Sequence, residues 1–342
     1  MTGLMHATDW RPMGEVLEEE LVALQAAGLR RTLRAVQERR AGTVLLNGER
    51  IADFASNDYL GLAADARVAR AASAVLQAEG TGAGASRLIS GNHPIHDSLE
   101  RELARYKSCD STLLFPSGYM VNIGVIPALA GPGDVIYSDE LNHASLVDGC
   151  RLSKATLRIF PHADIDALRT ALAADRGAFR RALIVVEGIF SMDGDLFPLD
   201  ALVPLAREFG AWTYVDDAHG TGVLGATGRG TIEHFGMSGE IDVVVGTLGK
   251  ALGTSGAFVG GSQVLIEFLT SRARSFIFTT GTPPALAAAT LEAMRLSQVE
   301  SWRRSAVVDR ARHLRDRLRQ GGRQISGLAH GHILPILIGD PN

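Results

Sequence analysis

Residues 181–219 read RALIVVEGIFSMDGDLFPLDALVPLAREFGAWTYVDDAH, and this stretch decides the fold. Residues 181–187 form an apolar run of strand length, residues 199–209 have helical spacing, and residues 212–216 form a second apolar run. Strands that are apolar along their length and separated by a helix are typical of a parallel sheet that is covered on both faces.

The same alternation extends in both directions along the chain. Further apolar strands are predicted at residues 111–115, 135–138, 156–160, 242–247 and 257–260. Helical patterns separate most of these strands. We therefore predict an α/β fold with a mostly parallel central sheet and helices on both faces.

Simpler patterns flank this alternation. Residues 15–41 are predicted to form one amphipathic helix, and an Asn-Gly turn joins short strands at residues 43–46 and 51–55. Residues 285–320 have a helical pattern, and residues 333–338 are predicted to form a strand.

The composition excludes several classes of protein. Of 342 residues, 46% are hydrophobic and 21% charged, which is typical of a globular chain and not of a disordered one. The net charge of -4 argues against a strongly basic nucleic-acid binder. The sequence shows no apolar run of membrane-spanning length and no secretory signal, so we expect no membrane partner. The 2 cysteines cannot make a disulfide framework, so we expect a reducing, cytoplasmic location. They also lack metal-ligand spacing, so we expect no metal.

Ligands of open α/β sheets bind at the carboxyl ends of the strands, where this chain carries polar residues. Gly118 and Tyr119 follow the strand at 111–115 and open a helix, whose free amides can bind a phosphate. A simple helix-capping turn is the alternative interpretation. His143 follows the strand at 135–138, where an ordinary surface histidine is the alternative.

Two further strand ends carry charged groups. Asp216 ends the strand at 212–216, where an ionised carboxylate needs a partner to offset its desolvation. Lys250 follows the strand at 242–247 between small residues, and a buried lysine amine is suited to imine formation. An imine-forming lysine, a carboxylate for a pyridinium nitrogen and a phosphate-binding helix together meet the requirements of pyridoxal phosphate.

One glycine-rich stretch resembles a different cofactor site. Residues 220–225, GTGVLG, match the G-x-G-x-x-G pattern of dinucleotide-binding proteins, and Asp242 lies about 20 residues further on. However, residues 216–219 separate the pattern from its strand, and Gly228 and Gly230 interrupt the helix that would carry the pyrophosphate. We therefore expect no dinucleotide site here.

Motifs from about residue 29 onward resemble those of the α-oxoamine synthases, a family of fold-type I pyridoxal-phosphate enzymes. The motifs are FASNDYLGL (54–62), GAGASRLISGNHPIHDSLE (82–100), FPSGYMVN (115–122), LNHASLVDG (141–149), EGIFSMDGDLFPL (187–199), VDDAHGTGVLG (215–225), TLGKALG (247–253) and FIFTTGTPP (276–284). The resemblance implies the fold-type I transferase fold, pyridoxal 5'-phosphate as cofactor, and a homodimer with the site at its interface.

The resemblance also implies an activity. Residues 86–91, SRLISG, are similar to the Ser-Arg-Leu-x-Ser-Gly pattern of the members that make 8-amino-7-oxononanoate in biotin biosynthesis. Such an enzyme condenses L-alanine with pimeloyl-CoA, or with the pimeloyl thioester of a carrier protein, and releases CO2. The alternatives are 5-aminolevulinate synthase activity, 2-amino-3-ketobutyrate CoA ligase activity, and a chain that binds the cofactor but is inactive.

The resemblance assigns catalytic roles to residues in these motifs. Lys250 is expected to form the imine with the cofactor and to remove the Cα proton of alanine. Asp216 is expected to pair with the pyridinium nitrogen, and His143 to stack on the ring and contact the substrate carboxylate. The resemblance implies further cofactor contacts from Gly118, Tyr119, Ser191, His219, Thr247 and Thr279, the last from the other subunit, and substrate contacts from Arg30 and Asn57.

Two features depart from the family pattern. Asp217 stands where these synthases usually have glutamate. Family members also continue past residues 333–338 through more of a small domain, which supplies a threonine and an arginine to the substrate side of the site. We therefore expect an N-terminal helix and hairpin segment at 1–50, a large cofactor-binding domain at 51–290, and the truncated start of a small C-terminal domain at 291–342.

Overall fold

The computed structural model describes residues 10–40, 42–323, 325, 331–337 and 339. Contacts divide the chain into two compact units, one of Met1–Phe54 with Leu337–Asn342 and one of Ala55–Ile336. Every predicted site residue except Arg30 belongs to the larger unit. The domain boundaries expected at residues 50 and 290 stay a prediction.

The smaller unit contains one helix and a three-stranded antiparallel sheet: α1 (Met13–Ala26), β1 (Val36–Arg40), β2 (Thr43–Leu46) and β3 (Glu49–Ala52). The prediction of one helix over residues 15–41 is therefore wrong beyond residue 26. Gly28 has a φ of 68°, and the Leu29 amide donates back to the Leu24 carbonyl at 2.8 Å. This left-handed glycine ends the helix, although the leucine spacing continues beyond it.

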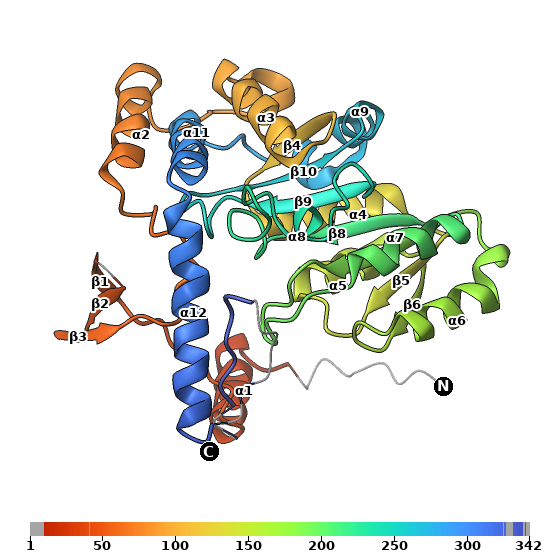
Figure 1. Cartoon of the computed structure of the whole chain (residues 1–342), viewed down its shortest axis with the longest axis horizontal. Coiled ribbons are helices and arrows are strands. Elements are labelled where there is room, and N and C mark those ends of the chain that lie inside the picture. The colour runs from red at the N-terminus through yellow and green to blue at the C-terminus, as the bar shows by residue number, and fades with distance from the viewer. Residues whose placement is uncertain (1–9, 41, 324, 326–330, 338, 340–342) are drawn as a thin grey trace. The chain divides into compact units, whose positions relative to one another are not determined.

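A seven-stranded sheet forms the centre of the larger unit (Figure 1). Its strands are β4 (Ser111–Phe115), β5 (Val135–Asp139), β6 (Thr156–Phe160), β7 (Ala182–Glu187), β8 (Trp212–Asp216), β9 (Val243–Thr247) and β10 (Ala257–Gly261). The strand order is β4-β10-β9-β8-β7-β5-β6, and only β10 is antiparallel to its neighbours. The prediction of a mostly parallel sheet is confirmed.

Helices follow most of these strands. The larger unit contains α2 (Ala66–Glu79), α3 (Pro94–Lys107), α4 (Gly118–Leu129), α5 (Ala144–Ser153), α6 (Ile165–Asp175), α7 (Leu199–Glu208), α8 (Thr231–His234), α9 (Gln263–Arg272), α10 (Arg274–Ile277), α11 (Pro284–Val299) and α12 (Trp302–Gln320). None of the helices in the described ranges is long and apolar enough to cross a bilayer.

The strand predicted at residues 333–338 does not form over residues 333–337, and residue 338 lies outside the described residues. A strand needs a neighbour for its backbone groups. No described segment pairs with residues 333–337, so the apolar pattern alone does not produce a strand.

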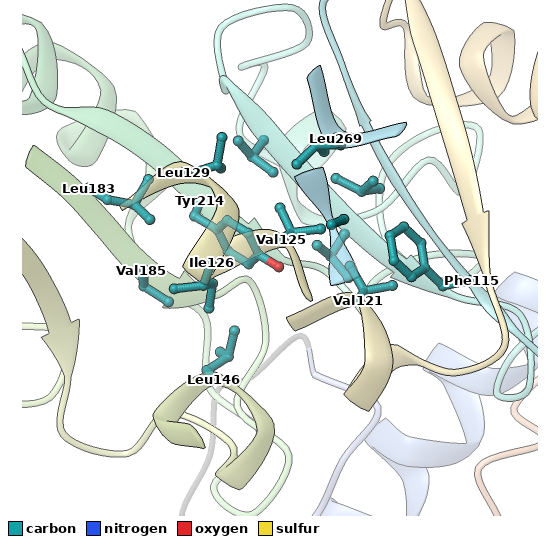
Figure 2. Close-up of a cluster of buried hydrophobic side chains, with 14 of the residues drawn as sticks. Phe115, Val121, Val125, Ile126, Leu129, Leu146, Leu183, Val185, Tyr214 and Leu269 are labelled. Atoms are coloured by element: carbon teal, nitrogen blue, oxygen red, sulfur yellow. The ribbon is translucent and has the colours of Figure 1, made fainter. Parts of the chain in front are cut away.

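The core lies on both faces of the sheet, as the apolar strands predict. On β7, Leu183 and Val185 belong to the cluster shown in Figure 2, whereas Ile184 and Val186 belong to a cluster on the other face. Every residue of β7 is buried, including Glu187 at its carboxyl end. Packing on two sides therefore fixes the strand ends that carry the polar residues.

Candidate active site

Three predicted residues meet at the carboxyl ends of β8 and β9. Asp216 ends β8, His219 follows it, and Lys250 lies in the connection from β9 to β10. The Nζ atom of Lys250 lies 2.7 Å from Nε2 of His219. The charges of Asp216 and Lys250 act on each other's pKa, so Asp216 lies near the lysine as well. Residues 216, 219 and 250 form one cluster, as their positions at the ends of adjacent strands predict.

The connection that carries Lys250 is anchored at both ends. Thr247 of β9 pairs with Ala257 of β10, so the connection starts and ends on one paired step of the sheet. Inside it, the Gly253 amide donates to the Lys250 carbonyl at 2.9 Å. Gly253 has a φ of 65°, and a Cβ there would lie 2.3 Å from the Ala63 nitrogen. A side chain at position 253 is excluded on both grounds, so the lysine loop is closely packed.

Burial sets the protonation of these groups. Desolvation lowers the pKa of Lys250, although Asp216 and Glu187 oppose the shift, and it raises the pKa of Asp216. Desolvation also lowers the pKa of His219 to about 3, so its imidazole is neutral near pH 7. The lysine amine is thereby shifted toward its neutral form, which is the nucleophilic form.

Glu187 is a site residue to which the sequence assigns no role. It pairs in register with Asp216 across β7 and β8, and its Oε1 accepts the His143 amide hydrogen at 2.6 Å. Desolvation, followed by the charge of Asp216, raises the pKa of Glu187 to about 8. A carboxylate that ends an otherwise apolar strand was the signal that could have revealed it.

This pKa predicts how pH changes the stability of the cofactor-free chain. Between the ordinary value of 4.5 and about 8, folded Glu187 holds a proton that the unfolded chain has lost. Stability relative to Glu187→Gln is therefore expected to fall across this window, by at most about 1.4 kcal/mol per pH unit. Urea unfolding of both proteins at each pH measures the difference, and parallel pH profiles would contradict the prediction.

His143 caps the N-terminus of α5 at the edge of the same cluster. Its Nδ1 accepts from the Ser145 amide at 3.2 Å and lies 2.7 Å from the Ser145 hydroxyl. Its charge lowers the pKa values of both Asp216 and His219, which places it close to them. The exposed imidazole is therefore held at Nδ1, and no hydrogen bond joins its Nε2 to another described residue.

The N-terminus of α4 forms a narrow space against Thr247. Ser117 caps the helix through its hydroxyl, and a Cβ on Gly118 would lie 2.9 Å from Cγ2 of Thr247. First-turn amides of a helix have no partner within the helix, so they are available to a phosphate. Tyr119 is 45% exposed, and its hydroxyl donates to Asp148.

Tyr59 connects another predicted residue to the cluster, and the sequence assigned it no role. Its hydroxyl lies 2.6 Å from Nδ1 of His219 and 3.2 Å from Oδ1 of Asn57. The Asn57 side chain therefore reaches the site through Tyr59. Tyr59 follows Asn57 within the motif 54–62, which was the available signal.

The remaining predicted contacts are not joined to the cluster by hydrogen bonds of the described side chains. Ser191 lies in the turn after β7, where the Phe190 amide bonds to the Asp195 carbonyl at 3.0 Å. Thr279 follows α10 in a partly exposed segment. Arg30 is exposed in the smaller unit. The roles of these three residues stay predictions.

A buried ion pair fixes the segment that follows Asp216. The Lys107 ammonium lies 2.7 Å from Oδ2 of Asp217, and both side chains are at most 1% exposed. Oδ1 of Asp217 accepts from the Thr231 amide and hydroxyl, and Lys107 also donates to Thr221 at 3.1 Å. Both carboxylate oxygens of Asp217 therefore have partners. The aspartate at this position, where the family usually has glutamate, is long enough to form the ion pair with Lys107.

Breaking this pair leaves a buried charge without a partner. Lys107→Met is expected to lower the free energy of unfolding by about 3–5 kcal/mol. The matched control Arg169→Met removes a pair to Glu208 whose side chains are 48% and 51% exposed. That control is expected to cost at most about 1 kcal/mol. Equal losses in urea unfolding of the two variants would contradict the importance of burial.

These residues fit pyridoxal phosphate. Lys250 offers an amine that burial shifts toward neutrality, Asp216 offers a buried carboxylate, and the space at Gly118 lies beside free helix amides. The group presents an aldehyde, a ring nitrogen and a phosphate, one for each of these features.

Residues 49–342 match the family described as aminotransferase class I and II. The chain belongs to the aminotransferase class I and II family. Within this family it is an α-oxoamine synthase, and pyridoxal phosphate is its cofactor.

The chain is also similar to individual curated members of the aminotransferase class I and II family. An 8-amino-7-oxononanoate synthase from Geobacter sulfurreducens is 48% identical, over 94% of this chain and 82% of the relative. The same enzyme from Symbiobacterium thermophilum is 44% identical, over 95% and 83%. A solved serine palmitoyltransferase from S. paucimobilis with a bound PLP–myriocin aldimine has a TM-score of 0.90 at 29% identity, covering 96% of this chain and 87% of that one.

Proposed function

We propose that this chain is a pyridoxal-phosphate-dependent acyltransferase that condenses L-alanine with a pimeloyl thioester to 8-amino-7-oxononanoate, releasing CO2 and the thiol. The observation that carries the proposal is the identity of 41–50% to curated 8-amino-7-oxononanoate synthases, over most of the chain. The cluster of Lys250, Asp216 and His143 supports it, because decarboxylative condensation needs an amine, a ring-pairing carboxylate and a group for the substrate carboxylate.

Each residue of the site has a separate role in the proposed reaction. When bound, pyridoxal phosphate supplies an electron sink for negative charge on the Cα atom of an amino acid. Lys250 holds the cofactor through its neutral amine and then accepts the Cα proton. Asp216, whose carboxylate accepts hydrogen bonds from Asn122 and from the Ala218 amide, would hold the proton of the ring nitrogen in place. His143 binds the alanine carboxylate, and Gly118 with Thr247 holds the phosphate.

Arg30 and Asn57 are assigned to substrate binding in the same proposal. Asn57 lies 3.2 Å from the hydroxyl of Tyr59, which contacts His219. The guanidinium of Arg30 suits a carboxylate or a phosphate of the acyl donor. Ser191 and His219 are assigned to the phenolic oxygen of the cofactor, and Tyr119 supplies a further amide to its phosphate.

We further propose a homodimer that brings Thr279 of one subunit to the phosphate site of the other. An exposed apolar surface supports this, because Ile89 is 81% and Phe278 71% exposed. The Ser86 hydroxyl bonds to the Ile277 carbonyl at 3.0 Å, so the two segments lie side by side. Ile89→Ser with Phe278→Ser is expected to shift sedimentation toward the monomer. The control Val264→Ser, which replaces an apolar side chain that is exposed on a different helix, is expected to leave sedimentation unchanged. Unchanged sedimentation of the double variant would contradict the surface assignment.

The proposed location is the cytoplasm. Both cysteines are free, with Cys150 buried and Cys109 half-buried. Free cysteines support a reducing compartment.

Substrate choice tests the proposed reaction. The cofactor-loaded protein is incubated with L-alanine, glycine or L-serine and with pimeloyl-CoA, the pimeloyl carrier-protein thioester, succinyl-CoA, acetyl-CoA or palmitoyl-CoA, and thiol release is measured. We expect release with L-alanine and a pimeloyl thioester. A preference for glycine with succinyl-CoA or acetyl-CoA would indicate 5-aminolevulinate synthase or 2-amino-3-ketobutyrate ligase activity. A yellow protein that releases no thiol with any pair would indicate an inactive chain.

A further inference from the structure

A buried amide lies between the two groups that the proposed function assigns to the cofactor ring. Asn122, on α4, is 1% exposed. Its Nδ2 donates to Oδ2 of Asp216 at 2.8 Å and to the Ser145 hydroxyl at 2.9 Å. Its Oδ1 accepts from the Tyr214 hydroxyl at 2.6 Å. All the hydrogen-bonding groups of this side chain that point into the site are thereby used.

The close approach of two helices makes this contact possible. Ser145 lies on α5, and Gly149 lies one turn further along the same helix. A Cβ on Gly149 would lie 2.6 Å from the backbone carbonyl oxygen of Asn122 and 3.0 Å from Cδ1 of Ile126. Glycine at this position allows α5 to lie against α4, so that Ser145 reaches Asn122.

The direction of each hydrogen bond in this network is determined. Asp216 can only accept while it is ionised, so the amide nitrogen of Asn122 faces it and the carbonyl oxygen faces Tyr214. The Ser145 oxygen accepts from Asn122, which leaves its hydrogen for Nδ1 of His143, 2.7 Å away. Nδ1 therefore accepts, and the proton of neutral His143 lies on Nε2.

We infer that Asn122 is a positioning residue that controls two cofactor-facing groups at once, the ionisation of Asp216 and, through Ser145, the tautomer and orientation of His143. The Tyr214 hydroxyl fixes the orientation of the Asn122 amide by donating to its Oδ1. Its ring is fully buried among aliphatic side chains of the cluster in Figure 2, so it cannot move without disturbing the core.

The electrostatics agree with this geometry. Desolvation raises the pKa of Asp216, and the hydrogen bond from Asn122 is the largest effect that lowers it again. Without the amide, a larger fraction of Asp216 is protonated at a given pH and cannot hold a protonated ring nitrogen. The titratable groups that face Asp216 in the described structure are Lys250, His143, Glu187 and Tyr214, and all four remain in Asn122→Leu.

The network has an Asp216 arm, which is the bond from Asn122 to Asp216, and a His143 arm, which runs from Asn122 through Ser145 to His143. The test compares the two arms by titrating the cofactor-free chain with pyridoxal phosphate at several pH values. Asn122→Leu is expected to weaken binding about 10- to 100-fold near neutral pH, the scale of a hydrogen bond to a charged group. Raising the pH is expected to recover part of the loss, because Asp216 then ionises. Ser145→Ala keeps the Asp216 arm, so it is expected to bind the cofactor normally and to lose about tenfold in kcat/KM for alanine.

The double variant Asn122→Leu/Tyr214→Phe keeps the experiment interpretable, because it removes the Tyr214 hydroxyl that the single variant leaves unpaired. Wild-type pH dependence of cofactor binding in a folded Asn122 variant would overturn the inference. Equal loss of cofactor affinity in Ser145→Ala would also overturn it, because both variants would then only loosen the fold. If neither Asn122 variant folds, normal alanine kinetics in Ser145→Ala would still refute the His143 arm.

The inference rests on the proposed function, because it assumes that Asp216 meets the ring nitrogen. The two can fail separately. A chain that shows the expected cofactor-binding pattern but condenses no substrates would refute the proposed reaction and leave the role of Asn122 standing.

Discussion

Lys250→Ala is expected to abolish both turnover and the visible absorbance of the bound cofactor. The amine of Lys250 lies 2.7 Å from Nε2 of His219, and burial lowers its pKa toward the neutral form. The variant removes both the covalent attachment of the cofactor and the group that accepts the Cα proton. We expect the rate of product formation to fall by about 10,000-fold or more. Spectra and thiol release measure the two effects.

Lys154→Asn is the matched control for this change. Lys154 is exposed and has a φ of 59°, a left-handed conformation that asparagine also adopts. The control is expected to keep the absorbance and the activity. Full activity in Lys250→Ala would contradict the assignment of the site and, with it, the proposed function.

Asp216→Asn is expected to give a folded protein that binds the cofactor more weakly and turns over about 100- to 1,000-fold more slowly, the cost of removing one electrostatic stabiliser. Burial raises the pKa of Asp216, so its ionised form is costly in the cofactor-free chain, and the amide removes that cost. The amide has only one acceptor oxygen, so its NH2 group faces either the Ala218 amide or Nδ2 of Asn122, both of which donate to Asp216. The two effects oppose each other, and thermal unfolding should therefore show only a small net change in stability. Steady-state rates with alanine measure the defect.

The same variant makes a second, independent prediction about Glu187. The charge of Asp216 is the second-largest cause that raises the pKa of Glu187 to about 8. Without it, that pKa should be lower, and the pH window over which Glu187 reduces stability should narrow. A window that stays unchanged would show that burial alone shifts Glu187.

Much of the fold can be predicted from the sequence because each central strand is buried on both faces. The run at 182–187 is apolar up to Glu187, and the structure makes it a central strand. Where burial is absent the pattern misleads. The leucine spacing through residue 33 predicts a helix, but Gly28 ends it, and the apolar residues 333–337 have no neighbouring strand among the described residues.

The site could be predicted only as far as it lies at strand ends. Asp216 ends a strand, and His219 and Lys250 each follow one, so their meeting could be expected. Asn122 bonds to Asp216, which is 94 positions away in the sequence, and Tyr59 bonds to His219, which is 160 positions away. A local sequence pattern cannot predict such contacts. Their functions arise from three-dimensional contacts, so they become visible only in the structure.

The anchoring of the β9–β10 connection also has an entropic consequence. A lysine on a freely moving loop would lose conformational freedom whenever its amine met the cofactor or a substrate proton. Here the paired step Thr247–Ala257 and the packing of Gly253 have already restricted that freedom during folding. The amine is therefore presented at a high effective molarity, and what remains to be ordered in each catalytic cycle is the side chain of Lys250 alone.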